Sequence, residues 1–199
     1  LIKPSRKLVK VNRVFDGYIN REKFYRLDRN EDPVGWDEKI FSKFLKTITP
    51  LDYASYSDSN ELINKLSNWT GLNPDHFYIT SGADGAIKNI FEVFIDPKDL
   101  VLMQDPCWPM YWVYSNVYQA EILKLQFEDD LNFNAENFID LINTKKPRIT
   151  IIANPNMPTG TLINQETLEK IIEATKQVSS LLVVDEAYFL FCKFTAINY

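Results

Sequence analysis

The chain has 199 residues, of which 45% are hydrophobic and 25% are charged, a composition typical of a globular protein with one sizeable core, or one domain and a piece of a second. Its formal net charge of −5 argues against a nucleic-acid-binding protein, because such proteins usually carry a basic patch. No apolar run approaches the roughly 20 residues that span a bilayer, and the basic start at residues 1–7 lacks the apolar stretch of a secretory signal, so we expect a protein without membrane contacts. Two cysteines give no disulfide framework, so a reducing cytoplasm is the expected location.

Cysteine and histidine are scarce. The two cysteines, Cys107 and Cys192, form neither a disulfide framework nor a metal-ligand pattern, and His76 is the single histidine. We therefore expect no metal site built on these side chains.

The first third of the chain predicts an arm followed by helices. Residues 1–35 have mixed charge and little periodicity, whereas the next apolar residues recur at helical spacing and predict a helix over residues 35–48 that Pro50 ends. Ser59 is a candidate N-cap for a further helix, and Gly71 is its expected stop.

From residue 77 onward, short apolar strands alternate with amphipathic helices. The expected strands are residues 77–80, 100–103, 121–125, 148–153 and 181–184. The expected helices are residues 84–94, 110–118, 135–143 and 165–177. This alternation predicts βαβ units and a three-layer α/β/α fold with a mostly parallel sheet. In such folds ligands bind outside the carboxyl ends of the strands, so the chemistry is expected there.

The first expected strand leads into the segment Thr80-Ser81-Gly82-Ala83-Asp84-Gly85 and then into a helix. Free amide groups and the helix dipole favour an anion at such a place, phosphate above all. A plain tight turn between strand and helix explains the same residues. The segment has neither the Walker nor the dinucleotide glycine spacing.

The next two expected strand ends carry aromatic and amide side chains. Trp108 lies in an aromatic segment that can stack on a flat heterocycle or pack in the core. Asn154 and Asn156 lie in a proline-rich turn that ends at Gly160, and their amides can donate hydrogen bonds to a ring oxygen or serve the turn alone.

The last expected strand ends on Asp185. A carboxylate that follows a buried apolar strand is costly unless it is paired, and it can form an ion pair with a protonated heteroaromatic nitrogen. A Mg²⁺ ligand and a solvent-facing helix cap are the competing interpretations. Tyr188 follows three residues later and can donate to a phenolate oxygen.

Together, the Ser-Gly-Ala-Asp-Gly segment, the Pro-Thr-Gly turn and the Asp-Glu-Ala-Tyr segment resemble the cofactor site of fold-type-I pyridoxal-phosphate enzymes. The likeness is greatest to class II aminotransferases of the histidinol-phosphate type. The resemblance implies a large domain of this fold type at residues 50–199, incomplete at its C-terminus. It implies that residues 1–49 are an N-terminal arm and linking helix that belong partly to the small domain.

The resemblance also implies roles for individual residues. The phosphate loop corresponds to Gly82, Ala83, Asp84 and Gly85. Trp108 corresponds to the aromatic residue that stacks on the pyridine ring, Asp185 to the carboxylate that pairs with the ring nitrogen, and Tyr188 to the tyrosine near the 3-oxygen. Tyr56 resembles the tyrosine that reaches the phosphate of a neighbouring subunit, which implies a homodimer, and Asn30 lies in a stretch that resembles the one beside the substrate.

Two positions depart from the family pattern. Met157 stands where the family usually has the asparagine bonded to the 3-oxygen, and Asn156 or Asn154 is the expected substitute. The lysine that forms the Schiff base lies beyond Asp185 in this family, and Lys193 follows too soon to take its place. We therefore expect no catalytic residue within this chain.

The resemblance implies an enzyme of amino-acid biosynthesis that transfers an amino group from an amino acid or amine, such as a histidinol-phosphate-like donor, to a 2-oxo acid. A pyridoxal-phosphate-dependent decarboxylase of the same fold is an alternative, because fold does not set the reaction. A catalytically inactive fragment is a third, favoured by Met157 and the missing lysine. A Mg²⁺-dependent phosphate enzyme is a fourth, which leaves Trp108 without a role.

Overall fold

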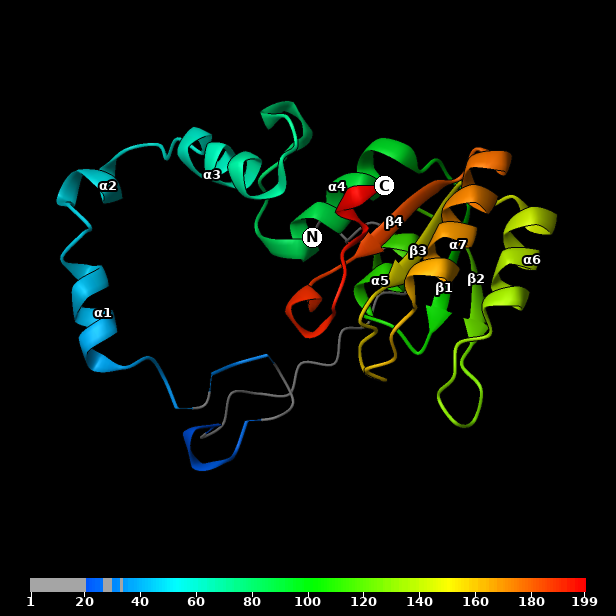
Figure 1. Ribbon diagram of the computed structural model, residues 1–199, viewed down its shortest axis with the longest axis horizontal. Coiled ribbons are helices and arrows are strands. Elements are labelled where there is room, and N and C mark those ends of the chain that lie inside the picture. The colour runs from blue at the N-terminus through cyan, green and yellow to red at the C-terminus, as the bar shows by residue number, and fades with distance from the viewer. Residues whose placement is uncertain (1–20, 27–29, 33) are drawn as a thin grey trace, which may run out of the picture. The chain divides into compact units, whose positions relative to one another are not determined.

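The computed structural model describes residues 21–26, 30–32 and 34–199 (Figure 1). Residues 78–199 belong to one compact unit, and the described residues up to Phe77 belong to a second. Most of the arm expected at residues 1–35 lies outside the described residues. The expected division between residues 49 and 50 stays a prediction.

A parallel sheet of four strands organises residues 78–199, in the order β2-β1-β3-β4 (Figure 1). Its strands are β1 (Leu100–Asp105), β2 (Glu121–Gln126), β3 (Ile149–Ala153) and β4 (Leu181–Asp185). Each strand pairs in parallel with its neighbours, so their carboxyl ends share one edge. All five residues of the central strand β3 are buried, as expected for a parallel strand covered on both faces.

Helices cover both faces of this sheet (Figure 1). They are α4 (Gly82–Phe94), α5 (Met110–Val117), α6 (Ala135–Lys145) and α7 (Gln165–Val178). One core joins α4 and α5 to the sheet through Phe91, Tyr111 and Ile151, and the other joins α6 and α7 to it through residues such as Phe138 and Leu168. The expected three-layer α/β/α fold with a parallel sheet is therefore confirmed.

The prediction of a strand at residues 77–80 is wrong. Residues 78–80 are irregular, and the Tyr78 side chain is 77% exposed. A strand needs a neighbour to pair its amide and carbonyl groups, and no strand of the described residues pairs with this segment. The helix that follows begins at Gly82 rather than at Asp84.

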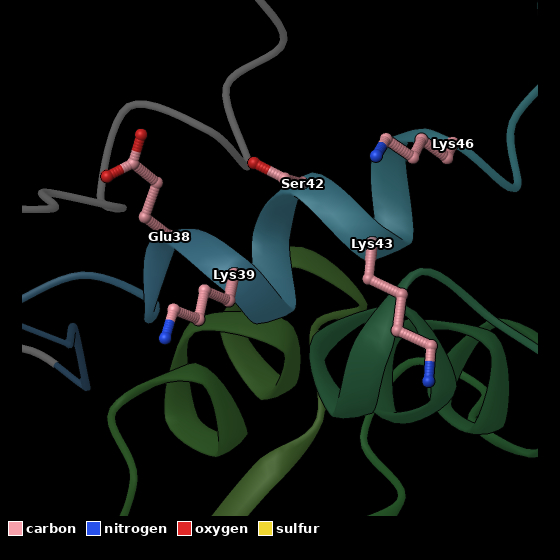
Figure 2. A pocket seen from close by; sticks show the side chains of 5 residues that line it. All are labelled: Glu38, Lys39, Ser42, Lys43 and Lys46. Carbon is pink, nitrogen blue, oxygen red and sulfur yellow. The ribbon is translucent and has the colours of Figure 1, made fainter.

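The second unit contains short helices. They are η2 (Arg21–Lys23), α1 (Glu38–Leu45), α2 (Pro50–Ala54), α3 (Asn60–Thr70) and η3 (Pro74–His76). None of α1, α2 and α3 has a buried residue. Lys39, Lys43 and Lys46 line a shallow hollow on α1 with Glu38 and Ser42 (Figure 2). Charged side chains along one exposed helix are a solvated surface, so we assign no site there.

Local capping explains where these helices differ from expectation. α1 begins later than the predicted helix because the Asp37 carboxylate caps its start, and it ends three residues earlier, at Leu45. Pro50 opens α2 at the first turn, where Thr49 and Asp52 form a capping box that we had not predicted. The Ser59 side chain makes no cap hydrogen bond at α3, whereas Gly71 ends that helix in the left-handed conformation, as expected.

The last residues form two short 3-10 helices, η4 (Phe189–Phe191) and η5 (Ala196–Asn198). The Glu186 carboxylate accepts hydrogen bonds from the Thr195 hydroxyl at 2.6 Å and from the Ala196 amide at 2.7 Å. These bonds hold the end of the chain against the segment that follows β4. In the part of the chain that the structure describes, no helix is long and apolar enough to cross a membrane.

Candidate active site

Helix α4 begins at the sheet edge where the strands end, and the side chain of its N-cap residue does not cap its first amide groups. Gly82 adopts a φ of +70°, a conformation that glycine adopts without strain. Ser81 is the N-cap residue but makes no side-chain cap hydrogen bond. The Gly82 N–H donates to the Thr80 carbonyl at 2.8 Å. Because the first amide groups of a helix have no acceptor within it, the residues after Gly82 present N–H groups and the positive end of the helix dipole. The arrangement suits an anion.

The one acidic side chain in this first turn bonds elsewhere. The Trp108 indole N–H donates to the Asp84 carboxylate at 3.0 Å, across 24 positions of the sequence. Asp84 therefore holds the indole ring next to the start of α4. An aromatic ring and the amide groups at the start of α4 lie side by side as a result.

Asp185 ends β4 at the same edge. Its carboxylate accepts a hydrogen bond from the Tyr111 hydroxyl at 2.6 Å and another from the Ala187 amide at 2.9 Å. A carboxylate offers about four lone-pair sites, so these two donors leave sites for a further donor. A protonated ring nitrogen is such a donor.

Tyr111 is the partner that sequence reasoning missed. Burial, together with the negative charge of Asp185, raises the pKa of the Tyr111 phenol well above its ordinary value, so the hydroxyl stays protonated and donates. The available signal was its place three residues after Trp108, which lets one segment reach both carboxylates.

The turn after β3 is bonded into the same edge. The Asn154 amide N–H donates to the Asp185 carbonyl at 2.9 Å and so extends the pairing of β3 with β4. The Asn156 side-chain amide donates to the Pro106 carbonyl at 3.1 Å and to the Thr159 hydroxyl at 2.9 Å. Because a carbonyl only accepts, the Pro106 contact also fixes which end of this amide carries the hydrogens.

These contacts restrict the substitute that we expected for the missing asparagine. Both amide hydrogens of Asn156 are engaged, while its buried Oδ1 has no partner among the described residues. The Asn154 side chain bonds the backbone of Ile163 through both its nitrogen and its oxygen. Donation to a ring oxygen from either side chain would require exchange of an existing bond. Tyr188 is partly buried, and its hydroxyl makes no bond to another described residue.

The predicted site residues fall into two groups. Gly82, Ala83, Asp84, Gly85, Trp108, Asn156, Asp185 and Tyr188 all lie in the unit of residues 78–199. The other two, Tyr56 and Asn30, belong to the second unit, where the side chains of both are exposed. Hydrogen bonds connect Asp84 with Trp108, and Asp185 with Tyr111.

Comparison with protein families decides what this arrangement belongs to. Residues 39–196 match the family model described as aminotransferase class I and II. The chain belongs to the class I and II aminotransferase family. This match covers most of the chain and includes every sequence segment discussed above except the arm.

Individual relatives of this aminotransferase chain agree with the family match. It is 29% identical, over 88% of its length, to the histidinol-phosphate aminotransferase of Caldanaerobacter subterraneus subsp. tengcongensis and covers 50% of that protein. It is 31% identical, over 84% of its length, to that of Thermoanaerobacter sp. and covers 47% of it. The chain thus spans about half the length of the curated relatives it matches.

Solved structures show the same fold. A putative histidinol-phosphate aminotransferase from Erwinia carotovora atroseptica superimposes with a TM-score of 0.74 at 21% identity, over 85% of this chain and 50% of that one. The enzyme from Sinorhizobium meliloti, in complex with pyridoxal-5'-phosphate, superimposes with a TM-score of 0.71 at 21% identity, over 80% of this chain and 43% of that one.

The thiol beside Trp108 in the aminotransferase chain is expected to be inert. Burial, with the neighbouring Asp105 carboxylate, raises the pKa of Cys107 to about 12. Because the thiolate is the reactive form, a thiol reagent near neutral pH should modify Cys192, which is partly exposed, and leave Cys107 intact. Counting modified thiols per chain, before and after denaturant, tests this. Fast modification of a native Cys192→Ser variant would contradict it.

Proposed function

We propose that the complete protein transfers an amino group between an amino compound and a 2-oxo acid, with pyridoxal phosphate as its cofactor. The family match supports the reaction class. The observation that carries the cofactor is the grouping of an open helix start, an aromatic ring and a carboxylate at one sheet edge. Phosphate, a flat heterocycle and a protonated ring nitrogen are the groups that these three features suit.

Each part of the proposed site has a distinct task. The loop Gly82, Ala83, Asp84 and Gly85 would bind the phosphate, which suits the positive end of the helix dipole. The Gly82 N–H already donates to the Thr80 carbonyl at 2.8 Å, so the N–H groups of the three residues after it would be the donors. Trp108 would stack on the pyridine ring, and its bond to Asp84 would keep the indole plane in place. A side chain that is fixed before binding loses less conformational entropy when the ligand binds.

Asp185 would hold a proton on the ring nitrogen. Its remaining lone pairs can accept from that nitrogen, and its negative charge favours the protonated form. When bound, pyridoxal phosphate supplies an electron sink for the carbanion of the substrate. The contribution of Asp185 is to keep that sink charged.

The 3-oxygen of the ring has the fewest hydrogen-bond donors available to it. Met157 has no donor, and Asn156 already uses both amide hydrogens. Tyr188 would supply the hydroxyl at this oxygen. The chain's fit is therefore strong at the phosphate, the ring face and the ring nitrogen, and weaker at the 3-oxygen.

The proposal extends to the surroundings of the site. Tyr56 would reach the phosphate in the neighbouring subunit of a homodimer, and Asn30 would lie beside the substrate. Exposure of the Tyr56 side chain supports a role outside its own unit. The histidinol-phosphate aminotransferases among the relatives favour a donor of that type. A cytoplasmic location and a role in amino-acid biosynthesis complete the proposal.

The experiment has two arms. The first measures binding of pyridoxal phosphate to the chain by equilibrium dialysis and by quenching of tryptophan fluorescence, with inorganic phosphate as competitor. The second supplies the protein, as isolated from its natural source, with pyridoxal phosphate, histidinol phosphate and 2-oxoglutarate. Formation of the amino product supports the proposal. Release of CO₂ without amino transfer would identify a decarboxylase, and absence of both binding and turnover would identify an inactive fragment.

A further inference from the structure

The segment that opens α5 connects two carboxylates from different elements. The Tyr111 amide donates to the Trp108 carbonyl at 3.2 Å, so the two side chains lie one turn apart. Trp108 donates to Asp84 on α4, and Tyr111 donates to Asp185 at the end of β4. One turn of the chain thus bonds to both Asp84 and Asp185. The proposed function places Asp84 beside the phosphate of the ligand and Asp185 beside its ring nitrogen.

The Tyr111 ring has little freedom to move. Its side chain is 1% exposed and lies in the core between the sheet and helices α4 and α5. A buried hydroxyl costs free energy unless it is hydrogen-bonded, and the Tyr111 hydroxyl donates to the Asp185 carboxylate. The position of the hydroxyl is therefore set by the core, and the carboxylate must adapt to it.

Asp185 is held from three directions. Tyr111 bonds to one carboxylate oxygen, the Ala187 amide bonds to the other, and the Asn154 amide bonds to the backbone carbonyl. Removal of the Tyr111 hydroxyl would leave one oxygen without its donor. The Ala187 amide would then be the one donor left to orient the carboxylate.

We propose that Tyr111 is a positioning residue that fixes the Asp185 carboxylate for its contact with the ring nitrogen. The inference rests on the proposed function, because that function assigns the ring nitrogen to Asp185. Tyr111 itself touches no part of the ligand in this assignment. Its effect is transmitted through a single hydrogen bond.

The test compares Tyr111→Phe with the unaltered chain and with Tyr118→Phe. Tyr118 ends the same helix, and its ring packs on Phe91 with centroids 6.4 Å apart, so its replacement removes a hydroxyl without touching Asp185. Loss of one hydrogen bond of this kind is expected to weaken binding of pyridoxal phosphate about tenfold in Tyr111→Phe. Tyr118→Phe should bind as the unaltered chain does.

Two further readouts separate positioning from general loosening. Inorganic phosphate would bind at the start of α4 and would not reach Asp185, so its affinity should be equal in all three proteins. The amide N–H signal of Ala187 in nuclear magnetic resonance spectra should shift in Tyr111→Phe, because that amide bonds to the same carboxylate. If Tyr111→Phe fails to fold, 4-fluorophenylalanine at position 111 fills a similar volume without an O–H donor.

Unchanged cofactor affinity in Tyr111→Phe would overturn the inference, and so would an equal loss of cofactor and phosphate binding. If the unaltered chain binds no pyridoxal phosphate, the proposed function fails at that step. The Ala187 signal then still decides whether Tyr111 holds Asp185: a signal that stays in place overturns the inference independently.

Discussion

Replacement of Asp185 by asparagine is expected to weaken the binding of pyridoxal phosphate by about 10- to 100-fold, because a hydrogen bond to a charged group contributes about 1.5–3 kcal/mol. The side-chain oxygen of asparagine can still accept from the Ala187 amide, and its NH2 group can donate to the Tyr111 hydroxyl oxygen, so the fold should be unchanged. Equilibrium dialysis of the ligand against both proteins measures the change.

Glu186→Gln is the matched control for this substitution. It makes the same change from acid to amide one position later, in a side chain that bonds to Thr195 and Ala196 rather than at the proposed ring site. Its cofactor affinity should stay within about twofold of the unaltered chain, as expected for a substitution with no contact to the ligand. Equal losses in both variants would mean that Asp185 has no special contact with the ring.

The second large effect concerns stability. Phe91 on α4 is 0% exposed, and its ring packs against Tyr114 and Tyr118 with centroids 6.2 and 6.4 Å away. Phe91→Ala removes this buried ring and leaves a cavity, so we expect the free energy of unfolding to fall by about 3–5 kcal/mol. Equilibrium denaturation in urea, followed by circular dichroism, measures the loss.

Phe94→Ala provides the comparison on the same helix. Phe94 is 42% exposed, so the same truncation should cost about 1 kcal/mol or less. Phe91→Leu, which keeps most of the buried volume, should cost less than about 1.5 kcal/mol. A loss in Phe94→Ala as large as that in Phe91→Ala would show that α4 does not pack on the sheet through the Phe91 face.

The layered fold was predictable because its signal is local and repeated. Each strand from Leu100 onward is a short apolar run, and each helix between strands has apolar residues at helical spacing, so the expected bounds agree with the observed ones within two residues. Residues 77–80 have the same kind of sequence, yet they form no strand. A strand depends on a pairing partner that its own residues do not supply.

The exposed apolar surface has a similar explanation. Helix α1 carries Ile40, Phe41 and Phe44 at helical spacing, and each is at least 45% exposed. Periodicity predicts that a helix has an apolar face but not what covers it. The short helices of the second unit were therefore partly foreseen, whereas their lack of a buried core was not.

The amino-acid sequence by itself determined the alternation of strands and helices, the glycine-containing helix start that follows Ser81, and the carboxylate at the end of β4. These features depend on residues that are neighbours in the chain. Only the tertiary structure decided the partners of the site residues: Tyr111 bonds to Asp185 across 74 positions and Trp108 to Asp84 across 24. It also decided that the Asn156 side-chain amide donates to the Pro106 carbonyl and to the Thr159 hydroxyl. Parallel strands bring carboxyl ends that are distant in the sequence to one edge of the sheet. Which donor bonds to which acceptor is decided by the contacts at that edge.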